Sequence, residues 1–142
     1  MTNARRGEKG KTKNWGRKMH KIVEEDVNSI IEQVGFPMGD FEGKTILISG
    51  SAGFLGNYFL AVFARLNEKH FKTPCKVIAV DNYIAGSPKT NVFGIKDRNI
   101  VALDADISQS VVISLAKLLK LLGTSNLKVD YIIHAAGIAS PK

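Results

Sequence analysis

Residues 50–56 read GSAGFLG and are separated by one residue, Ser49, from the apolar run 45–48, TILI. Glycines occupy the first, fourth and seventh positions, and apolar residues at helical spacing follow over 54–67. Where a strand turns into a helix, the first helical N–H groups have no partner and the helix dipole adds partial positive charge. A turn with so few side chains lets an anion approach these donors, so the stretch predicts a phosphate-binding turn.

The three glycines have different predicted roles in such a turn. Gly50 makes the tight turn, Gly53 lets phosphate oxygens reach the backbone, and Gly56 lets the helix pack on the strand. An acid, Asp81, ends the next apolar run, 76–80. A carboxylate there can accept both ribose hydroxyls of an adenosine and repels a 2′-phosphate, which favours NAD over NADP. The alternative is an aspartate that only starts a turn.

Strands and helices alternate through the rest of the chain. The predicted strands are 45–48, 76–80, 100–103 and 129–134, and the predicted helices between them are 54–67 and 111–122. The strands are short apolar runs, as expected when helices cover both faces of a parallel sheet. The pattern predicts an α/β protein with a doubly wound parallel sheet in the strand order 3-2-1-4. The apolar positions expected to be buried in the first of these helices are Phe54, Leu55, Phe59, Leu60, Phe63 and Leu66.

The net charge of +7 lies at the N-terminus. Residues 1–21 hold eight Lys or Arg and one acid, whereas residues 22–142 hold twelve of each sign. Such a run is typical of a solvated arm, and a nucleic-acid contact through it is the less expected reading. Residues 22–43 are predicted to form an amphipathic helix and a connector. Its apolar positions are Ile22, Val23, Val27, Ile30, Ile31 and Val34.

Several other classes of site are disfavoured by the sequence. No apolar stretch approaches 18 residues, no apolar block of a secretory signal is present, and a single cysteine, Cys75, allows no internal disulfide or cysteine-cluster metal site. These features suit a reducing cytoplasm. Gly43-Lys44-Thr45 imitates the end of a P-loop, but it precedes the strand and position 38 is Met. His134, alone at the end of an apolar run, is expected to be packed or capped.

Residues 43–142 resemble the N-terminal half of an extended short-chain dehydrogenase/reductase, within the NAD-dependent nucleotide-sugar epimerase/dehydratase family. The resemblance is carried by Ser49 through Gly56, by VDNYIAGSPKTN (80–91), by Asp106-Ile107 and by HAAGIASP (134–141). The Ala-Ser-Pro ending is most similar to the UDP-glucuronate decarboxylase branch. The resemblance implies a Rossmann-like fold, incomplete here, preceded by the basic arm and the amphipathic helix.

The resemblance also implies a function and a set of cofactor contacts. Bound NAD would transiently oxidise a sugar hydroxyl of a nucleotide sugar, in an epimerase, dehydratase or decarboxylase reaction, and a homo-oligomer is expected. The implied cofactor-binding residues are Gly50, Gly53, Phe54, Leu55, Gly56, Asp81, Asn82, Asp106, Ile107, Ala135, Ala136 and Gly137.

The family's catalytic residues have no counterpart in these 142 residues. They are a Ser or Thr after the fifth strand and a Tyr-x-x-x-Lys pair, and the positions four residues after Tyr58, Tyr83 and Tyr131 hold Val, Ser and Ala. No catalytic or metal-binding residue is therefore predicted, and the chain is expected to be a fragment of a longer enzyme. Two alternatives remain: a non-catalytic NAD-binding module, and a methyltransferase, whose glycine turn fits GSAGFLG less well.

Overall fold

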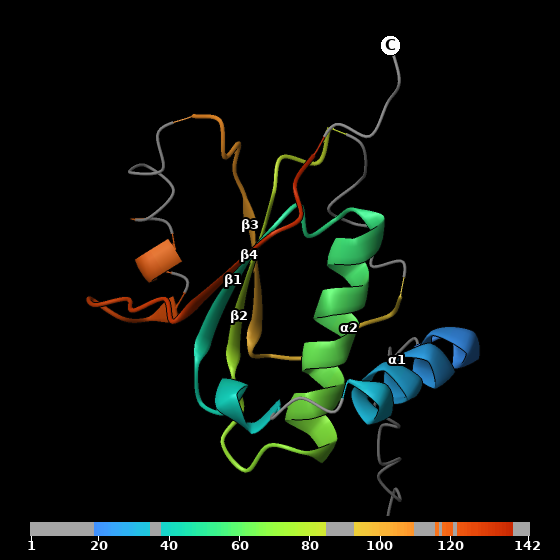
Figure 1. The fold of residues 1–142 in the computed structure, drawn as a ribbon. Coiled ribbons are helices and arrows are strands. Elements are labelled where there is room, and N and C mark those ends of the chain that lie inside the picture. The colour runs from blue at the N-terminus through green and yellow to red at the C-terminus, as the bar shows by residue number, and fades with distance from the viewer. Residues whose placement is uncertain are drawn as a thin grey trace, which may run out of the picture.

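The computed structural model describes residues 19–34, 38–84, 93–109, 116, 118–120 and 122–137. Its elements are α1 (Lys21–Gln33), the 3-10 helix η1 (Met38–Phe41), β1 (Thr45–Ser49), α2 (Phe54–Lys69), β2 (Lys76–Asp81), β3 (Ile100–Asp104) and β4 (Tyr131–His134). The strands form one parallel sheet in the order β3-β2-β1-β4 (Figure 1). The predicted α/β class and strand order are confirmed. The basic residues before Met19 lie outside the described part.

The element ends differ from the predicted ones by one or two residues. The first three strands each continue for one residue beyond their apolar run, and α2 continues to Lys69. β4 begins at Tyr131 and not at Val129, and Asp130 instead donates its amide N–H to the Thr45 carbonyl (2.8 Å) ahead of the strand. Most of the predicted helix 111–122 lies outside the described residues, and those described (116, 118–120 and 122) are helical.

Apolar side chains are buried on both faces of the sheet, which explains the continuous apolar runs. Successive strand residues point to opposite faces. Val77 accordingly belongs to the cluster that packs against α2, while Ile78 belongs to the cluster on the other face. The first cluster includes Phe63 and Leu66 of α2, and the second includes Leu118 from the partly described helical segment.

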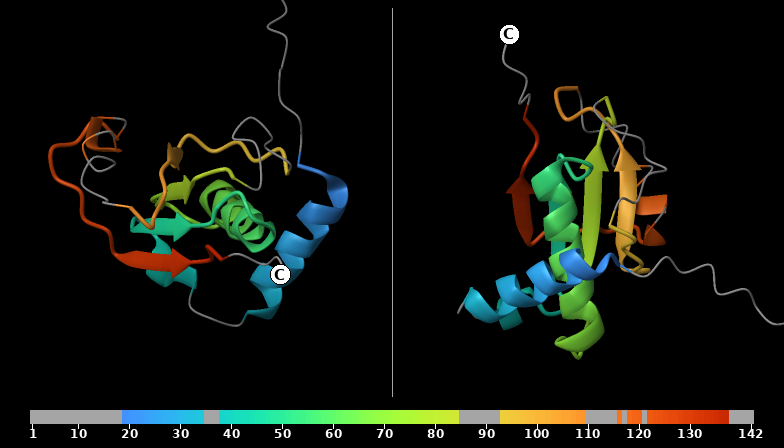
Figure 2. Two further views of the ribbon diagram at one scale, coloured as in Figure 1. Left: turned by 90° about the horizontal axis from the view of Figure 1, so that it is seen from above. Right: turned by 90° about the vertical axis from the view of Figure 1, so that its right-hand side faces the viewer.

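Helix α1 forms an outer layer, because it packs on α2 and α2 packs on the sheet (Figure 2). Val23 and Val27 are the residues that α1 buries, with Val27 fully enclosed. Ile22 and Val34, predicted on the same apolar face, are 61% and 46% exposed. The prediction was wrong for these two because they lie at the two ends of the helix, beyond its crossing with α2.

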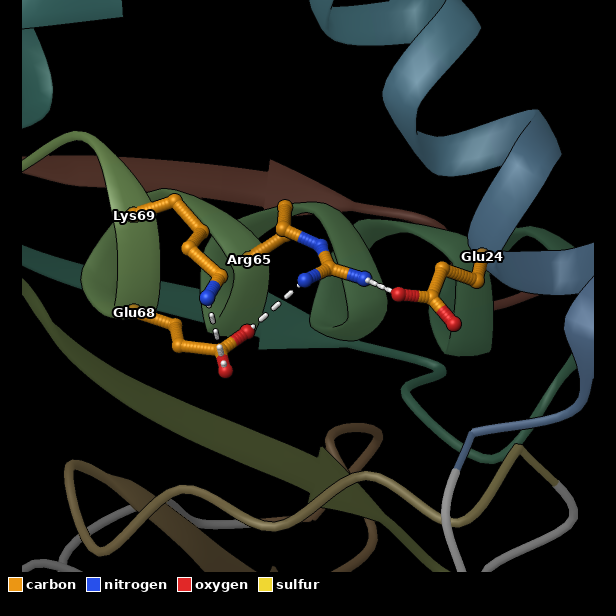
Figure 3. Close-up of polar contacts among 4 residues, drawn as sticks. All are labelled: Glu24, Arg65, Glu68 and Lys69. Atoms are coloured by element: carbon orange, nitrogen blue, oxygen red, sulfur yellow. Dashed lines mark hydrogen bonds and ion pairs between the residues drawn. The ribbon is translucent and has the colours of Figure 1, made fainter.

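A buried arginine joins the two helices. The Arg65 guanidinium of α2 lies 2.5 Å from a carboxylate oxygen of Glu24 on α1 and 2.9 Å from one of Glu68, and Lys69 lies near the other Glu68 oxygen (Figure 3). Only 10% of the Arg65 side chain is exposed. An arginine shielded to this degree interacts with carboxylates more strongly than a surface pair does. The contact therefore fixes α1 on α2.

Candidate functional site

The turn after β1 is in backbone contact with the segment after β4. Gly50 has φ +70°, a conformation that side chains rarely adopt. A Cβ atom on Gly50 would lie 2.5 Å from the Ala136 nitrogen and 2.6 Å from the Ala135 carbonyl carbon. Both the turn and the approach of the second segment therefore require glycine here, as the predicted tight turn does. The small residues at 135 and 136 are placed beside the glycine turn.

Gly56 is a packing glycine in the first turn of α2. A Cβ on it would overlap the Gly50 carbonyl oxygen and lie 2.7 Å from the Cα of Ser51. The helix therefore packs directly on the turn that precedes it, rather than only on the strand as predicted. Any side chain at this position would push the helix away from the turn.

Gly53 differs from the other two glycines. Its backbone (φ −72°, ψ 173°) is an ordinary extended conformation that any residue adopts. The nearest atom to a Cβ there is the Gly50 carbonyl oxygen, at 3.2 Å. The backbone conformation therefore does not demand glycine. A Cβ would press on that oxygen, which would have to move by a few tenths of an ångström, and, apart from its chain neighbours, no other described atom lies within 4 Å of the Cβ.

The first turn of α2 presents amide donors ahead of the helix. Gly53 is the N-cap and supplies no side-chain acceptor, and no acidic residue lies in the first turn. The N–H groups of Phe54, Leu55 and Gly56 have no acceptor within the helix, as in any helix start. Phe54 and Leu55 are 75% and 62% exposed, so their predicted burial was wrong. They lie level with the carboxyl ends of the strands, where the sheet gives them no surface to pack on.

The Asp81 carboxylate, at the carboxyl end of β2, is fixed beside this turn. One oxygen accepts the N–H of Ala52 within the glycine turn (2.9 Å), and the other accepts the N–H of Tyr83 (2.8 Å). Asp81 therefore starts a turn, as the alternative reading held, and also contacts the glycine turn. Tyr83 has φ +53°, and burial together with the charges of Asp81 and Asp104 raises the pKa of its hydroxyl.

Asn82 and Asp106 lie together after β2 and β3. Hydrogen bonds from the side chain and the backbone N–H of Ser108, with a smaller contribution from the Asn82 side chain, hold the pKa of Asp106 below its usual value. Ile107 is 43% exposed beside them. The predicted pair that follows β3 is thus brought to the same edge of the sheet as Asp81.

A hydrogen bond that the sequence did not predict joins β1 to β4 below the glycine turn. The buried Ser49 hydroxyl lies 2.6 Å from Nδ1 of His134, and Ala135 donates its N–H to the Ser49 carbonyl. His134 is thus held by a side-chain partner, in line with the capped histidine that was expected. Gly137, the last of the predicted contacts, is exposed, and a Cβ there would meet nothing within 4 Å.

The described part of the chain holds no group of three or more His, Cys, Asp or Glu side chains placed to bind a metal ion. It also contains no helix that is long and apolar enough to cross a membrane. Lys44 precedes β1 and so lies at the opposite end of that strand from the glycine turn. This position agrees with the prediction that Gly43-Lys44-Thr45 is not part of a P-loop.

No protein-family model matches the chain, and no curated protein matches it.

Proposed function

We propose that this chain is the NAD-binding half of a nucleotide-sugar-modifying enzyme of the extended short-chain dehydrogenase/reductase type, with a Rossmann-like doubly wound sheet. The observation that carries the proposal is the Asp81 carboxylate, fixed at the end of β2 beside a glycine turn that opens a helix. In parallel α/β sheets, ligands bind at the carboxyl ends of the strands.

The space at Gly53 fits a pyrophosphate. Unpaired N–H groups at a helix start and the helix dipole both favour an anion. Among the described residues, no side chain caps this helix start, and its first turn contains no acid. The backbone conformation at 53 does not require glycine, and the tight contact that a Cβ would make is with one atom, the Gly50 carbonyl oxygen at 3.2 Å. Approach of a ligand to the backbone is a further reason for glycine there.

The Asp81 carboxylate fits the ribose of an adenosine. Each of its oxygens accepts one backbone N–H, and a carboxylate oxygen has two acceptor positions, so each can still accept a ribose hydroxyl. The two backbone bonds also fix the orientation of the carboxylate before any ligand arrives, which lowers the cost of ordering on binding. A 2′-phosphate at this position would meet like charge.

The chain's own residues bind and orient the cofactor in this proposal. When bound, the nicotinamide supplies the hydride acceptor for transient oxidation of a sugar hydroxyl. None of the tyrosines in residues 1–142 is followed four residues later by lysine, so no residue of this chain is assigned to proton transfer. The nucleotide-sugar substrate and a homo-oligomeric state belong to the proposal through the resemblance of residues 43–142 to this family. A cytoplasmic location belongs to it through the sequence features that suit a reducing compartment, among them the single cysteine.

Calorimetric titration with NAD and NADP tests the proposal. We expect NAD to bind at least about tenfold more tightly, since one such charge clash of about 1.4 kcal/mol gives that ratio. Asp81→Asn should reduce the preference. Asp104→Asn is the matched control, because Asp104 is paired with Asp81 in the β2–β3 register and is exposed. Equal affinities in the wild type, or a preference for NADP, would overturn the assignment of Asp81.

A further inference from the structure

Tyr58 lies where three segments of the chain meet. Its hydroxyl donates to a carboxylate oxygen of Asp26 on α1 (2.8 Å). Its ring packs edge-on against Phe54, with the ring centres 5.3 Å apart, and against Phe93 at 4.9 Å. Phe54 is the first residue of α2, and Phe93 belongs to the connection between β2 and β3. Tyr58 thus links α1 to the helix start that follows the glycine turn.

We propose that Tyr58 is a positioning residue for the glycine turn. Helix α1, which holds Tyr58 through Asp26, then contributes to the geometry of the cofactor site as well as to the stability of the fold. The cofactor role in this inference rests on the proposed function. Tyr58 is not one of the predicted cofactor-binding residues, and it acts through Phe54, which is one of them.

The start of α2 is held on its carbonyl side, because the Asn57 side chain donates to the Ala52 and Gly53 carbonyls, but no side chain accepts from its first N–H groups. Gly53 provides no side-chain cap, and Phe54 is 75% exposed. A helix start without a cap frays more easily. Tyr58 stands four residues after Phe54, so the two side chains lie on the same face of the helix one turn apart. The contact between the two rings therefore holds the first turn, whose N–H groups are the proposed phosphate donors.

The Asp26 hydrogen bond fixes the Tyr58 ring in turn. The bond to Asp26, followed by partial burial and the Asp26 charge, raises the pKa of the Tyr58 hydroxyl above its usual value of 10.0. The hydroxyl therefore stays protonated, and remains a donor, throughout the physiological pH range. Without Asp26 the ring would keep its aromatic contacts but lose the bond that sets its orientation.

The chain offers a matched control in the second polar contact between the same helices. Glu24 pairs with Arg65, seven residues beyond Tyr58 (Figure 3). Seven residues correspond to about 10 Å along the helix axis, which places this contact well away from the glycine turn. If α1 only stabilises the fold, loss of either contact should have the same consequences for the turn.

The experiment compares Tyr58→Phe, Asp26→Ala and Glu24→Ala in the full chain. Three quantities are measured: the melting temperature, amide hydrogen exchange over residues 51–57 without ligand, and the Kd for NAD. We expect Tyr58→Phe and Asp26→Ala to speed exchange in this segment several-fold. We expect both to raise the Kd about threefold, a fraction of one hydrogen bond's net contribution. Glu24→Ala should lower the melting temperature while leaving exchange at 51–57 and the Kd unchanged.

Two results would overturn the positioning role: unchanged exchange at 51–57 in Tyr58→Phe and Asp26→Ala, or equal changes in all three variants. Failure of the proposed function has a different signature. If the wild type does not bind NAD while the exchange pattern is as expected, the cofactor assignment falls and the mechanical link from α1 to the turn stands.

Discussion

The two ends of the same sheet are built differently. At the amino end, polar side chains close the loops on the protein's own backbone. One Glu42 oxygen accepts the N–H groups of both Lys72 (2.5 Å) and Thr73 (2.8 Å), and Asp130 accepts the N–H of Thr45 (3.0 Å). The Asn67 side chain bridges both backbone groups of Cys75 and the Asp97 carboxylate.

At the carboxyl end, the described residues leave the start of α2 without a side chain that accepts from its first N–H groups. Gly53 carries no side chain, the first turn of α2 has no capping side chain, and Phe54, Leu55 and Ile84 are 75%, 62% and 84% exposed. Polar side chains do close other turns at this end. Both Asp81 oxygens accept backbone N–H groups, the Asn57 side chain donates to the Ala52 and Gly53 carbonyls, and Asp106 accepts the N–H of Ser108. The difference therefore lies at the start of α2, which presents amide donors without a side-chain acceptor, and exposed apolar side chains, to a ligand.

The largest loss of folding stability should come from Gly56→Val. The Cβ atom alone would overlap the Gly50 carbonyl oxygen and crowd the Ser51 backbone, so the helix must separate from the turn. We expect a loss of about 4 kcal/mol or more, comparable to the whole stability of a small domain. Far-UV circular dichroism and thermal melting measure it. A folded variant with an unchanged melting temperature would show that this end is not packed as described.

Gly53→Val should separate ligand binding from folding. A Cβ there would lie 3.2 Å from the Gly50 carbonyl oxygen, a tight contact that a backbone shift of a few tenths of an ångström relieves, so we expect the circular dichroism spectrum to stay close to that of the wild type. The side chain would exclude a pyrophosphate from the helix start. Loss of several charge-assisted hydrogen bonds, each about 1.5–3 kcal/mol, should weaken NAD binding about 100-fold or more. A variant that still binds NAD normally would place the phosphate elsewhere.

A smaller loss of folding stability, which depends on pH, is expected from Asp130→Asn at the amino end of the sheet. The Thr45 N–H, with help from Lys128, lowers the pKa of Asp130 in the folded chain. Its contribution to stability is therefore fully present above the unfolded-state pKa of about 3.9 and disappears as the pH falls through the lower folded value. The variant should melt below the wild type near pH 7, and the gap should shrink below about pH 4.

A control variant, and the affinity of Asp130→Asn for NAD, test whether the effect on melting is specific to the Asp130 charge. Asp40→Asn makes the same change of charge on an exposed side chain of η1 and should show no such pH-dependent gap. Asp130→Asn should leave the Kd for NAD unchanged, since it acts at the opposite end of the sheet. A gap that stays constant from pH 3 to 7 would contradict the role given to the Asp130 charge.

Most of the fold was predictable from local sequence, because buried parallel strands are continuous apolar runs and the glycine turn marks the junction of β1 with α2. The exposure of Phe54 and Leu55 was missed, since helical spacing alone does not show where the sheet surface ends. Contacts between distant residues were missed as well. Glu24 and Arg65 are 41 residues apart and Ser49 and His134 are 85 apart, and no local pattern relates them.

Amide hydrogen exchange of the full wild-type chain, with and without saturating NAD, tests most directly whether the ligand binds at the carboxyl end of the sheet. We predict slower exchange with NAD at residues 51–57 and 82–84. Residues 72–76 and 97–100, at the amino end of the sheet, should exchange at the same rate with and without NAD. Absence of any protection by NAD would contradict the assignment of the cofactor to the glycine turn. Protection that is equal at both ends of the sheet, or greater at the amino end, would contradict it as well.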